Sequence, residues 1–153
     1  ERSTSSHNTI TIGDFEQNEV WGGFRVAKRA KILSFIEIEN EFSSSHDGYK
    51  NIGVIHNRKF ITNKDSIHIY DDLNKQDIYE QIAHFHFHPS RKSIVIKDSR
   101  VYFKNSNIEM LFKGEDISIK KEFYKYAYGF NKTENAIKLK VTFKSNLKTI
   151  INL

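Results

Sequence analysis

The stretch Ile137-Lys138-Leu139-Lys140-Val141-Thr142-Phe143-Lys144 decides the fold, because apolar and polar side chains alternate throughout it. Successive side chains of a β-strand point to opposite faces, so this period of two predicts a strand with one face in a core. Shorter β-branched or aromatic runs are separated by turn residues at roughly 8–12 residue intervals, a spacing typical of all-β domains. We therefore predict an antiparallel β-sandwich of roughly ten or more strands, with little helix. The shorter runs are residues 9–12, 94–96, 100–103 and 117–119.

Four other segments carry more specific predictions. Residues 26–42 are expected to form one long or bent strand, and residues 71–83 a loop followed by a strand. The serine triplet at 43–45 is predicted to be a loop, and Lys113-Gly114 a turn. No stretch rich in Pro, Gly or Ser divides the chain, so residues 1–153 are predicted to form a single domain.

The composition excludes several classes of protein. Aromatic residues make up 13% of the chain, with 12 Phe and 7 Tyr, which is too many for a disordered segment. No run approaches the roughly 18 apolar residues of a membrane-spanning helix. The absence of cysteine excludes disulfide scaffolds and thiolate metal sites. The net charge of +5 comes without a dense Lys/Arg run, so it fits a solvated surface or an acidic polymer and does not argue for nucleic acid.

The first residue is Glu1, and Met110 is the only methionine. A natural translation product begins with Met, so we expect a processed chain or a piece of a longer one. Any N-terminal targeting signal would then lie outside these residues.

Three histidines alternate in His84-Phe85-His86-Phe87-His88-Pro89. On a strand they share one face, which leaves Phe85 and Phe87 for the core. A row of imidazoles suits a transition metal, an anion or an active site, whereas the alternative is a solvent-facing strand whose polar residues are His. Pro89 lacks a backbone donor and is expected to end the strand.

Two further groups could carry function. Asp47-Gly48 is predicted to form a tight turn that presents His46 and Tyr49 on either side, either for proton transfer or as a plain hairpin with a packed Tyr. Trp21, the sole tryptophan, is more typical of a core than of a sugar-binding platform. Gly22-Gly23 beside it indicates a bulge or a close backbone approach.

An ordered series of blocks resembles the C-terminal β-sandwich of the heparinase II/III-like polysaccharide lyases, over nearly all 153 residues. The His-Asn-Thr block at 7–9 and the His-x-His-Pro block at 86–89 are its most diagnostic parts. The full series comprises residues 2–12, 17–25, His46-Asp47-Gly48-Tyr49, His56-Asn57-Arg58, His86-Phe87-His88-Pro89 and Tyr126-Ala127-Tyr128-Gly129.

The resemblance implies a two-domain lyase that cleaves uronate-containing acidic polysaccharide by β-elimination. An N-terminal α/α toroid, absent here, would carry much of the machinery, so this chain alone is expected to be inactive. The implied partners are the acidic polysaccharide and that helical domain, in the periplasm or outside the cell. The alternative is a non-catalytic polysaccharide-binding or structural β-sandwich.

The resemblance also implies site residues. Catalytic roles fall to His7, His46 and Tyr49. A structural zinc would be held by His7 together with His86 or His88, and by one carboxylate among Asp14, Glu16 and Glu19. The two roles of His7 compete, because the family's first block can hold two histidines and this chain has only one.

Overall fold

The computed structural model describes residues 2–75 and 79–153. Strands dominate it, and its helices are two single 3₁₀ turns, η1 (Thr4–Ser6) and η2 (Lys50–Ile52). Within the described residues, no helix is long and apolar enough to cross a bilayer. The strands are β1 (Ile10–Ile12), β2 (Glu19–Trp21), β3 (Arg25–Ala27), β4 (Ile32–Ile38), β5 (Glu41–Tyr49), β6 (Val54–Asn63), β7 (Ser66–Leu73), β8 (Gln81–His86), β9 (Ile94–Lys97), β10 (Arg100–Phe103), β11 (Glu109–Gly129) and β12 (Lys132–Asn152).

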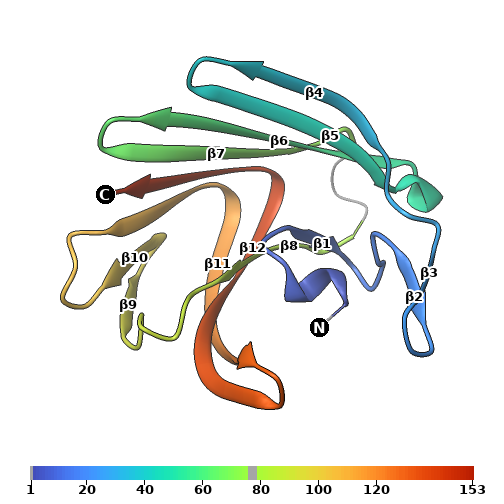
Figure 1. The fold of residues 1–153 in the computed structure, drawn as a ribbon. Coiled ribbons are helices and arrows are strands. Elements are labelled where there is room, and N and C mark those ends of the chain that lie inside the picture. Colours follow the sequence, from blue (N-terminus) through green and yellow to red (C-terminus); the bar gives the residue numbers. More distant parts are fainter. Residues whose placement is uncertain (1, 76–78) are drawn as a thin grey trace.

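Ten of these strands form one antiparallel sheet, which folds over into two layers (Figure 1). Along the sheet the strands follow the order β4-β5-β6-β7-β12-β11-β10-β9, and β8 pairs with both β12 and β1. We call the layer that contains β4 to β7 the first layer and the layer that contains β1 and β8 the second layer. The first half of β12 pairs with β8, whereas its second half pairs with β7. A strand that changes neighbours in this way turns a corner between two layers. The predicted antiparallel β-sandwich is thus confirmed, with β2 and β3 as a separate small hairpin.

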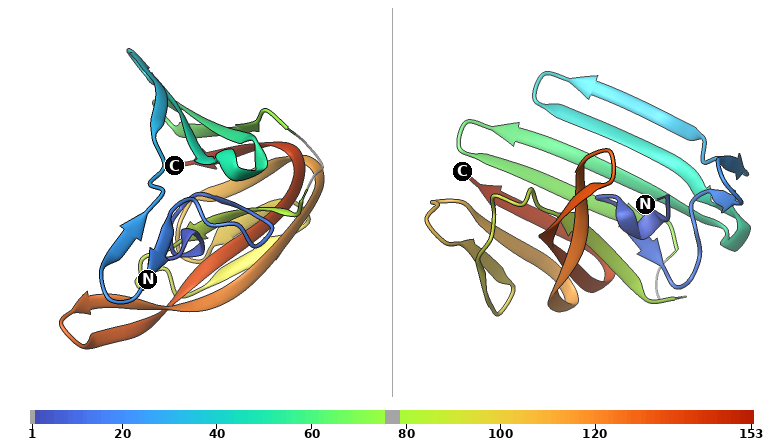
Figure 2. Two further views of the ribbon diagram at one scale, coloured as in Figure 1. Left: turned by 90° about the vertical axis from the view of Figure 1, so that its right-hand side faces the viewer. Right: turned by 60° about the horizontal axis from the view of Figure 1, so that its bottom comes forward.

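The corner lies where Gly114 meets the partner strand. The β11–β12 register shifts on either side of Glu115, which marks a bulge in the ladder. A Cβ atom at Gly114 would lie 2.7 Å from the Asn146 carbonyl oxygen, so only glycine fits. The turn predicted at Lys113-Gly114 is therefore wrong. It is a bend within a continuous hairpin, and the far part of that hairpin projects from the body (Figure 2).

The core lies between the two layers. Ile137, Leu139, Val141 and Phe143 are all at most 3% exposed, which confirms the alternation that predicted this strand. They pack in one apolar cluster with side chains of β10 and β11, including Val101, Met110 and Phe112.

Other local predictions need correction. Residues 26–42 form the end of β3, the whole of β4 and the start of β5, because the chain reverses at Glu39, whose φ is 42°. The serine triplet at 43–45 lies inside β5 and pairs with β6. In the 71–83 segment, β7 continues to Leu73 and β8 begins at Gln81, while residues 76–78 lie outside the described range. Trp21 is 45% exposed, so its predicted core position is wrong.

Candidate functional site

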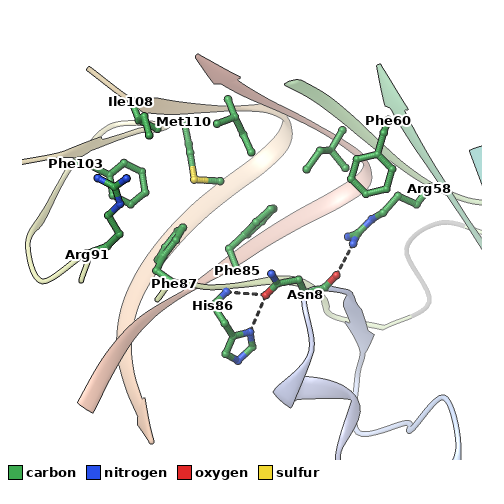
Figure 3. A pocket seen from close by; sticks show the side chains of 12 residues that line it. Asn8, Arg58, Phe60, Phe85, His86, Phe87, Arg91, Phe103, Ile108 and Met110 are labelled. Carbon is green, nitrogen blue, oxygen red and sulfur yellow. Dashed lines mark hydrogen bonds between the residues drawn. The ribbon is translucent and has the colours of Figure 1, made fainter. Parts of the chain in front are cut away.

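His86 is held at the end of β8 by the segment that precedes β1. Asn8 Oδ1 accepts a hydrogen bond from the His86 backbone N–H at 2.7 Å, and the His86 ring nitrogen Nδ1 lies 3.0 Å from the same oxygen (Figure 3). A carboxamide oxygen has no proton to give, so Nδ1 carries the proton and donates it. The other ring nitrogen, Nε2, therefore has a free lone pair.

Burial lowers the pKa of His86, and the positive charges of Lys138 and His7 lower it further, whereas a hydrogen bond with the Ser5 backbone opposes this shift without reversing it. The ring is therefore neutral at pH 7, and a neutral imidazole with a free Nε2 can act as a general base. His7 lies near enough to influence that ring electrostatically and is itself exposed. The structure thus brings together His7 and His86, which belong to the two most diagnostic blocks of the sequence.

A recess of about 370 Å³ opens beside His86, on the side of the β11–β12 hairpin. The Tyr124 ring packs edge-on against the His86 ring with 4.9 Å between centroids. The Tyr124 hydroxyl donates a hydrogen bond to the Phe87 carbonyl oxygen at 2.8 Å, which fixes the ring. The recess is lined by Ser5, Ser6, His86, Tyr124, Lys125, Tyr126, Ala127 and Lys138.

The pairing of β8, β12 and β11 places lysine side chains at this recess. Lys138 on β12 lies opposite His86 on β8 and opposite Glu122 on β11. The Nζ atoms of Lys138 and Lys140 each lie 3.4 Å from the Glu122 carboxylate. Two ammonium groups share one carboxylate, so the surface keeps a net positive charge beside a neutral base. That combination suits an anionic ligand with an acidic C–H.

A buried polar network supports Asn8 from the other side. Arg58 on β6 forms a bidentate pair with Asp71 on β7, with Nε–Oδ1 at 2.6 Å and Nη2–Oδ2 at 3.1 Å. Arg58 also donates a hydrogen bond from Nη1 to the Asn8 carbonyl oxygen. His56 Nε2 lies 2.7 Å from Asp71 Oδ1, and His46 Nε2 lies 3.1 Å from His56 Nδ1. The segment that orients His86 is therefore anchored to the first layer of the sandwich.

The hydrogen-bond donors around this network determine which ring nitrogen of each histidine carries the proton. The Gly48 N–H donates to His46 Nδ1 at 3.1 Å, so the proton of His46 is on Nε2. That proton is donated to His56 Nδ1, and the proton of His56 then lies on Nε2 and is donated to Asp71. Burial would raise the pKa of Asp71, but the His56 hydrogen bond and the Arg58 charge outweigh it and lower that pKa. Burial lowers the pKa of His46 to about 4, and the neighbouring His56 and Arg58, which disfavour a positive charge on this ring, lower it further.

His46 and Tyr49, for which catalytic roles are predicted, do not line the recess beside His86. The tight turn predicted at Asp47-Gly48 is wrong. Both residues lie inside β5, where the register with β6 shifts between His46 and Tyr49. Tyr49 is fully buried, and its hydroxyl donates to the Ile10 carbonyl oxygen at 2.6 Å. Burial raises the pKa of Tyr49. Both side chains have structural partners here, and their catalytic roles stay predictions.

The three alternating histidines, His84, His86 and His88, lie in different environments. His84 and His86 share a face, with 6.4 Å between ring centroids. His84 is nevertheless buried, and burial lowers its pKa to about 4. Phe85 packs in the core, as predicted. His88 lies beyond the end of β8, where the Ser90 N–H donates to its Nδ1 at 3.2 Å and its ring packs against Tyr126.

The predicted zinc ligands do not converge on one point. The Asn8 hydrogen bond to His86 Nδ1 leaves Nε2 of that ring available to a metal, whereas the lone pair on His88 Nδ1 accepts the Ser90 N–H. Among the predicted carboxylates, Glu16 accepts a hydrogen bond from the Thr4 N–H at 2.6 Å, and Glu19 pairs with Lys28 at 2.8 Å. Over residues 2–75 and 79–153, no group of three His, Asp or Glu side chains is placed to hold a metal ion. Zinc binding by these residues stays a prediction.

Several site residues escape sequence reasoning. Lys138 and Tyr124 join the site only through the register of β11, β12 and β8, which no local pattern reveals. Asp71 does leave a signal, because it occupies a core-facing position between Ile69 and Leu73 on β7. A carboxylate on the apolar face of a strand needs a buried partner, and that partner is Arg58.

Comparison with known proteins bears on the family and the fold of this chain. The family model described as "Heparinase II/III-like, C-terminal" matches residues 1–153. The crystal structure of heparan sulfate lyase HepC from Pedobacter heparinus is similar, with a TM-score of 0.75 and 16% identity over 99% of this chain and 24% of that chain. The heparinase III-BT4657 gene product is also similar, with a TM-score of 0.74 and 18% identity over 99% of this chain and 24% of that chain.

At sequence identities of 16% and 18%, the similarity to these solved structures shows a shared fold and no more. This chain spans about a quarter of the length of the two structures. No curated protein matches the sequence.

Proposed function

Because the chain belongs to the heparinase II/III-like family, whose C-terminal domain it matches, we propose that it is the β-sandwich part of a polysaccharide lyase. The substrate is an acidic, uronate-containing polysaccharide, which binds in the recess beside His86. The observation that carries this proposal is the convergence of a neutral imidazole with a free Nε2 and a surplus of lysine charge in one recess. Such a protein acts where these polymers occur, in the periplasm or outside the cell.

β-Elimination makes three chemical demands. A base removes the proton from the carbon next to the uronate carboxylate, and the bond from the neighbouring carbon to the glycosidic oxygen breaks as a C=C bond forms. The leaving oxygen takes up a proton. Positive charge or hydrogen-bond donors must stabilise the carboxylate while it carries the negative charge of the intermediate.

In this proposal, His86 Nε2 is the base and Asn8 keeps it in the correct tautomer. Lys138 faces the uronate carboxylate from the opposite strand. His7 and the Tyr126 hydroxyl are the groups of this chain available to protonate the leaving oxygen. The recess is open on one side, so a helical domain supplies the rest of the cleft. We therefore expect the chain alone to bind without measurable turnover.

Calorimetry tests the binding step. The ligands are a uronate-containing hexasaccharide and the same oligosaccharide with its carboxyl groups reduced to alcohols. Lys138→Met keeps the aliphatic stem and removes the charge, and it should weaken binding of the acidic form roughly tenfold while leaving the reduced form unchanged. Lys64→Met, in the turn between β6 and β7, is the matched control and should have no effect. Equal affinity for the two ligands, or indifference to Lys138→Met, would overturn the proposal.

A second measurement separates a lyase from a binding module. In a chain that also carries a helical domain, His86→Gln should abolish formation of unsaturated uronate, followed by its ultraviolet absorbance. Oligosaccharide affinity should be retained, because glutamine keeps a polar group there but cannot take the proton. If product formation survives the substitution, His86 is not the base.

A further inference from the structure

A cavity of about 370 Å³ lies between the two layers of the sandwich (Figure 3). Phe60, Ile69 and Met110 line it from the first layer, and Phe85 and Phe87 line it from the second. Native cores are close-packed, with few voids larger than a water molecule. A space of this size therefore exceeds an ordinary packing defect and has the dimensions of a small-molecule site.

The interior of this cavity is apolar, and its polar side chains are few. They are Asn8, Arg58, His86 and Arg91. Arg58 is compensated by its bidentate pair with Asp71. Arg91 is exposed and forms no salt bridge with a carboxylate in residues 2–75 and 79–153. The cavity therefore combines an aromatic and aliphatic interior with one uncompensated guanidinium.

This combination excludes a sugar as the occupant. Sugar hydroxyls lose their hydrogen bonds to water on entry, and the apolar side chains here offer no replacement. An apolar cavity of about 150 Å³ already binds benzene, so this one accepts a considerably larger apolar group. Its charge selects for an anion, since a guanidinium recognises a carboxylate or sulfate through paired N–H donors.

We propose that the cavity is a second binding site, for a small amphiphilic anion. The apolar chain or ring of the ligand fills the space between the layers, and its single carboxylate or sulfate group pairs with Arg91. The site stands independently of the polysaccharide recess, although His86 borders both and forms the wall between them.

Met110 offers a direct reporter, because it is the only methionine and lines the cavity. With methyl-¹³C-methionine, Met110 gives the only labelled signal from residues 1–153, and Met110→Leu identifies it in the spectrum. Decanoate below its micelle concentration should shift that signal in a saturable way, and decyl sulfate should do the same. Acetate should leave it unmoved, because it has no apolar chain. Decanol should bind more weakly than decanoate, because it has no charge.

Two substitutions test the two halves of the proposal. Arg91→Glu should weaken decanoate at least fivefold and leave decanol unchanged, whereas Lys92→Glu on the neighbouring exposed residue should affect neither. Ile108→Trp at the cavity wall should fill the space and abolish the response to both ligands. Thermal unfolding of each variant verifies that it is folded.

The proposal is overturned if the Met110 signal does not move with decanoate or decyl sulfate up to their micelle concentrations. It is equally overturned if the binding constant for decanoate survives Arg91→Glu, or if a folded Ile108→Trp variant binds as the wild type does. Because the ligands contain no sugar, a negative result here leaves the polysaccharide proposal untouched, and the reverse also holds.

Discussion

At the scale of single residues, Asn8 decides which nitrogen of His86 is free. Its Oδ1 accepts from both the backbone and the ring of His86, so only one neutral tautomer fits. The Arg58 hydrogen bond to the Asn8 carbonyl holds this arrangement in place. A motif that pairs His7 with Asn8 thus supplies one exposed histidine and orients a second histidine far along the chain.

This assignment predicts the ¹⁵N NMR signature of His86. At pH 7 the ring should be neutral and protonated on Nδ1, with an unprotonated Nε2. Asn8→Ala removes the acceptor and should return the ring to a mixture of tautomers. A wild-type signal from a ring protonated on Nε2 would contradict the assignment.

The Arg58–Asp71 pair predicts a large stability effect. Arg58→Met leaves the fully buried Asp71 carboxylate without its cation, which should lower the free energy of unfolding by about 3 kcal/mol. Urea denaturation measures the change. Lys59→Met, on the next residue of β6, loses a partly exposed ion pair with Glu41 at 3.8 Å and a cation–π contact with the Tyr70 ring, and it should cost about 1 kcal/mol. Similar losses in the two variants would show that burial of the pair does not matter.

At the scale of elements, the β11–β12 hairpin connects the fold to the site. Its bend at Gly114 lets one half of β12 pair with β7 and the other half with β8. Beyond the bend, the same hairpin brings Tyr124 and Lys138 to the recess. Any change that straightens the bend should therefore affect both the core and the recess.

Gly114→Ala tests the bend. Its Cβ would lie 2.7 Å from the Asn146 carbonyl oxygen, so the two strands must move apart, at a cost of about 1–3 kcal/mol in the free energy of unfolding. Gly129→Ala in the same strand is the control, since its Cβ would meet Lys132 only at ordinary contact distance, 3.7 Å. The control should unfold nearly as the wild type does. A neutral Gly114→Ala would show that the corner is not set by this contact.

The sequence predicts those parts of the fold that have a local pattern. Alternation identifies the buried face of 137–144, but it cannot place the reversal at Glu39, where a non-glycine residue adopts a positive φ. It also cannot distinguish a turn at Gly114 from a bend that keeps both strands paired. In the site, too, only the residues that belong to a local sequence motif can be predicted. The motifs place His7 and His86 in one site, whereas Lys138 and Tyr124 depend on a three-strand register that only the folded chain defines.

At the scale of the whole molecule, the buried His84 and the half-buried His46 link stability to pH. Burial lowers the pKa of His46 and of His84 to about 4 in the folded chain, against 6.5 for a solvent-exposed histidine. Between these pH values the unfolded chain binds more protons than the folded chain. Stability is therefore fully present above about pH 6.5 and falls as the pH drops toward 4.

Urea denaturation at a series of pH values checks this linkage. Each histidine contributes a slope of at most about 1.4 kcal/mol per pH unit within that window. The double substitution His46→Gln and His84→Gln should flatten the curve between pH 4 and 6.5. The loss that follows from protonation of Asp71 lies at lower pH and should remain. A wild-type curve that is flat or that falls with rising pH would contradict the burial of these rings.

The central claim is that the surface around His86 binds an acidic polysaccharide. The most direct measurement is an NMR titration of the ¹⁵N-labelled chain with a uronate-containing hexasaccharide at low salt. We expect saturable shifts at His7, His86, Tyr124 and Lys138, with no change at distant positions such as Lys64. Shifts confined to another face, or no saturable shift at all, would contradict it.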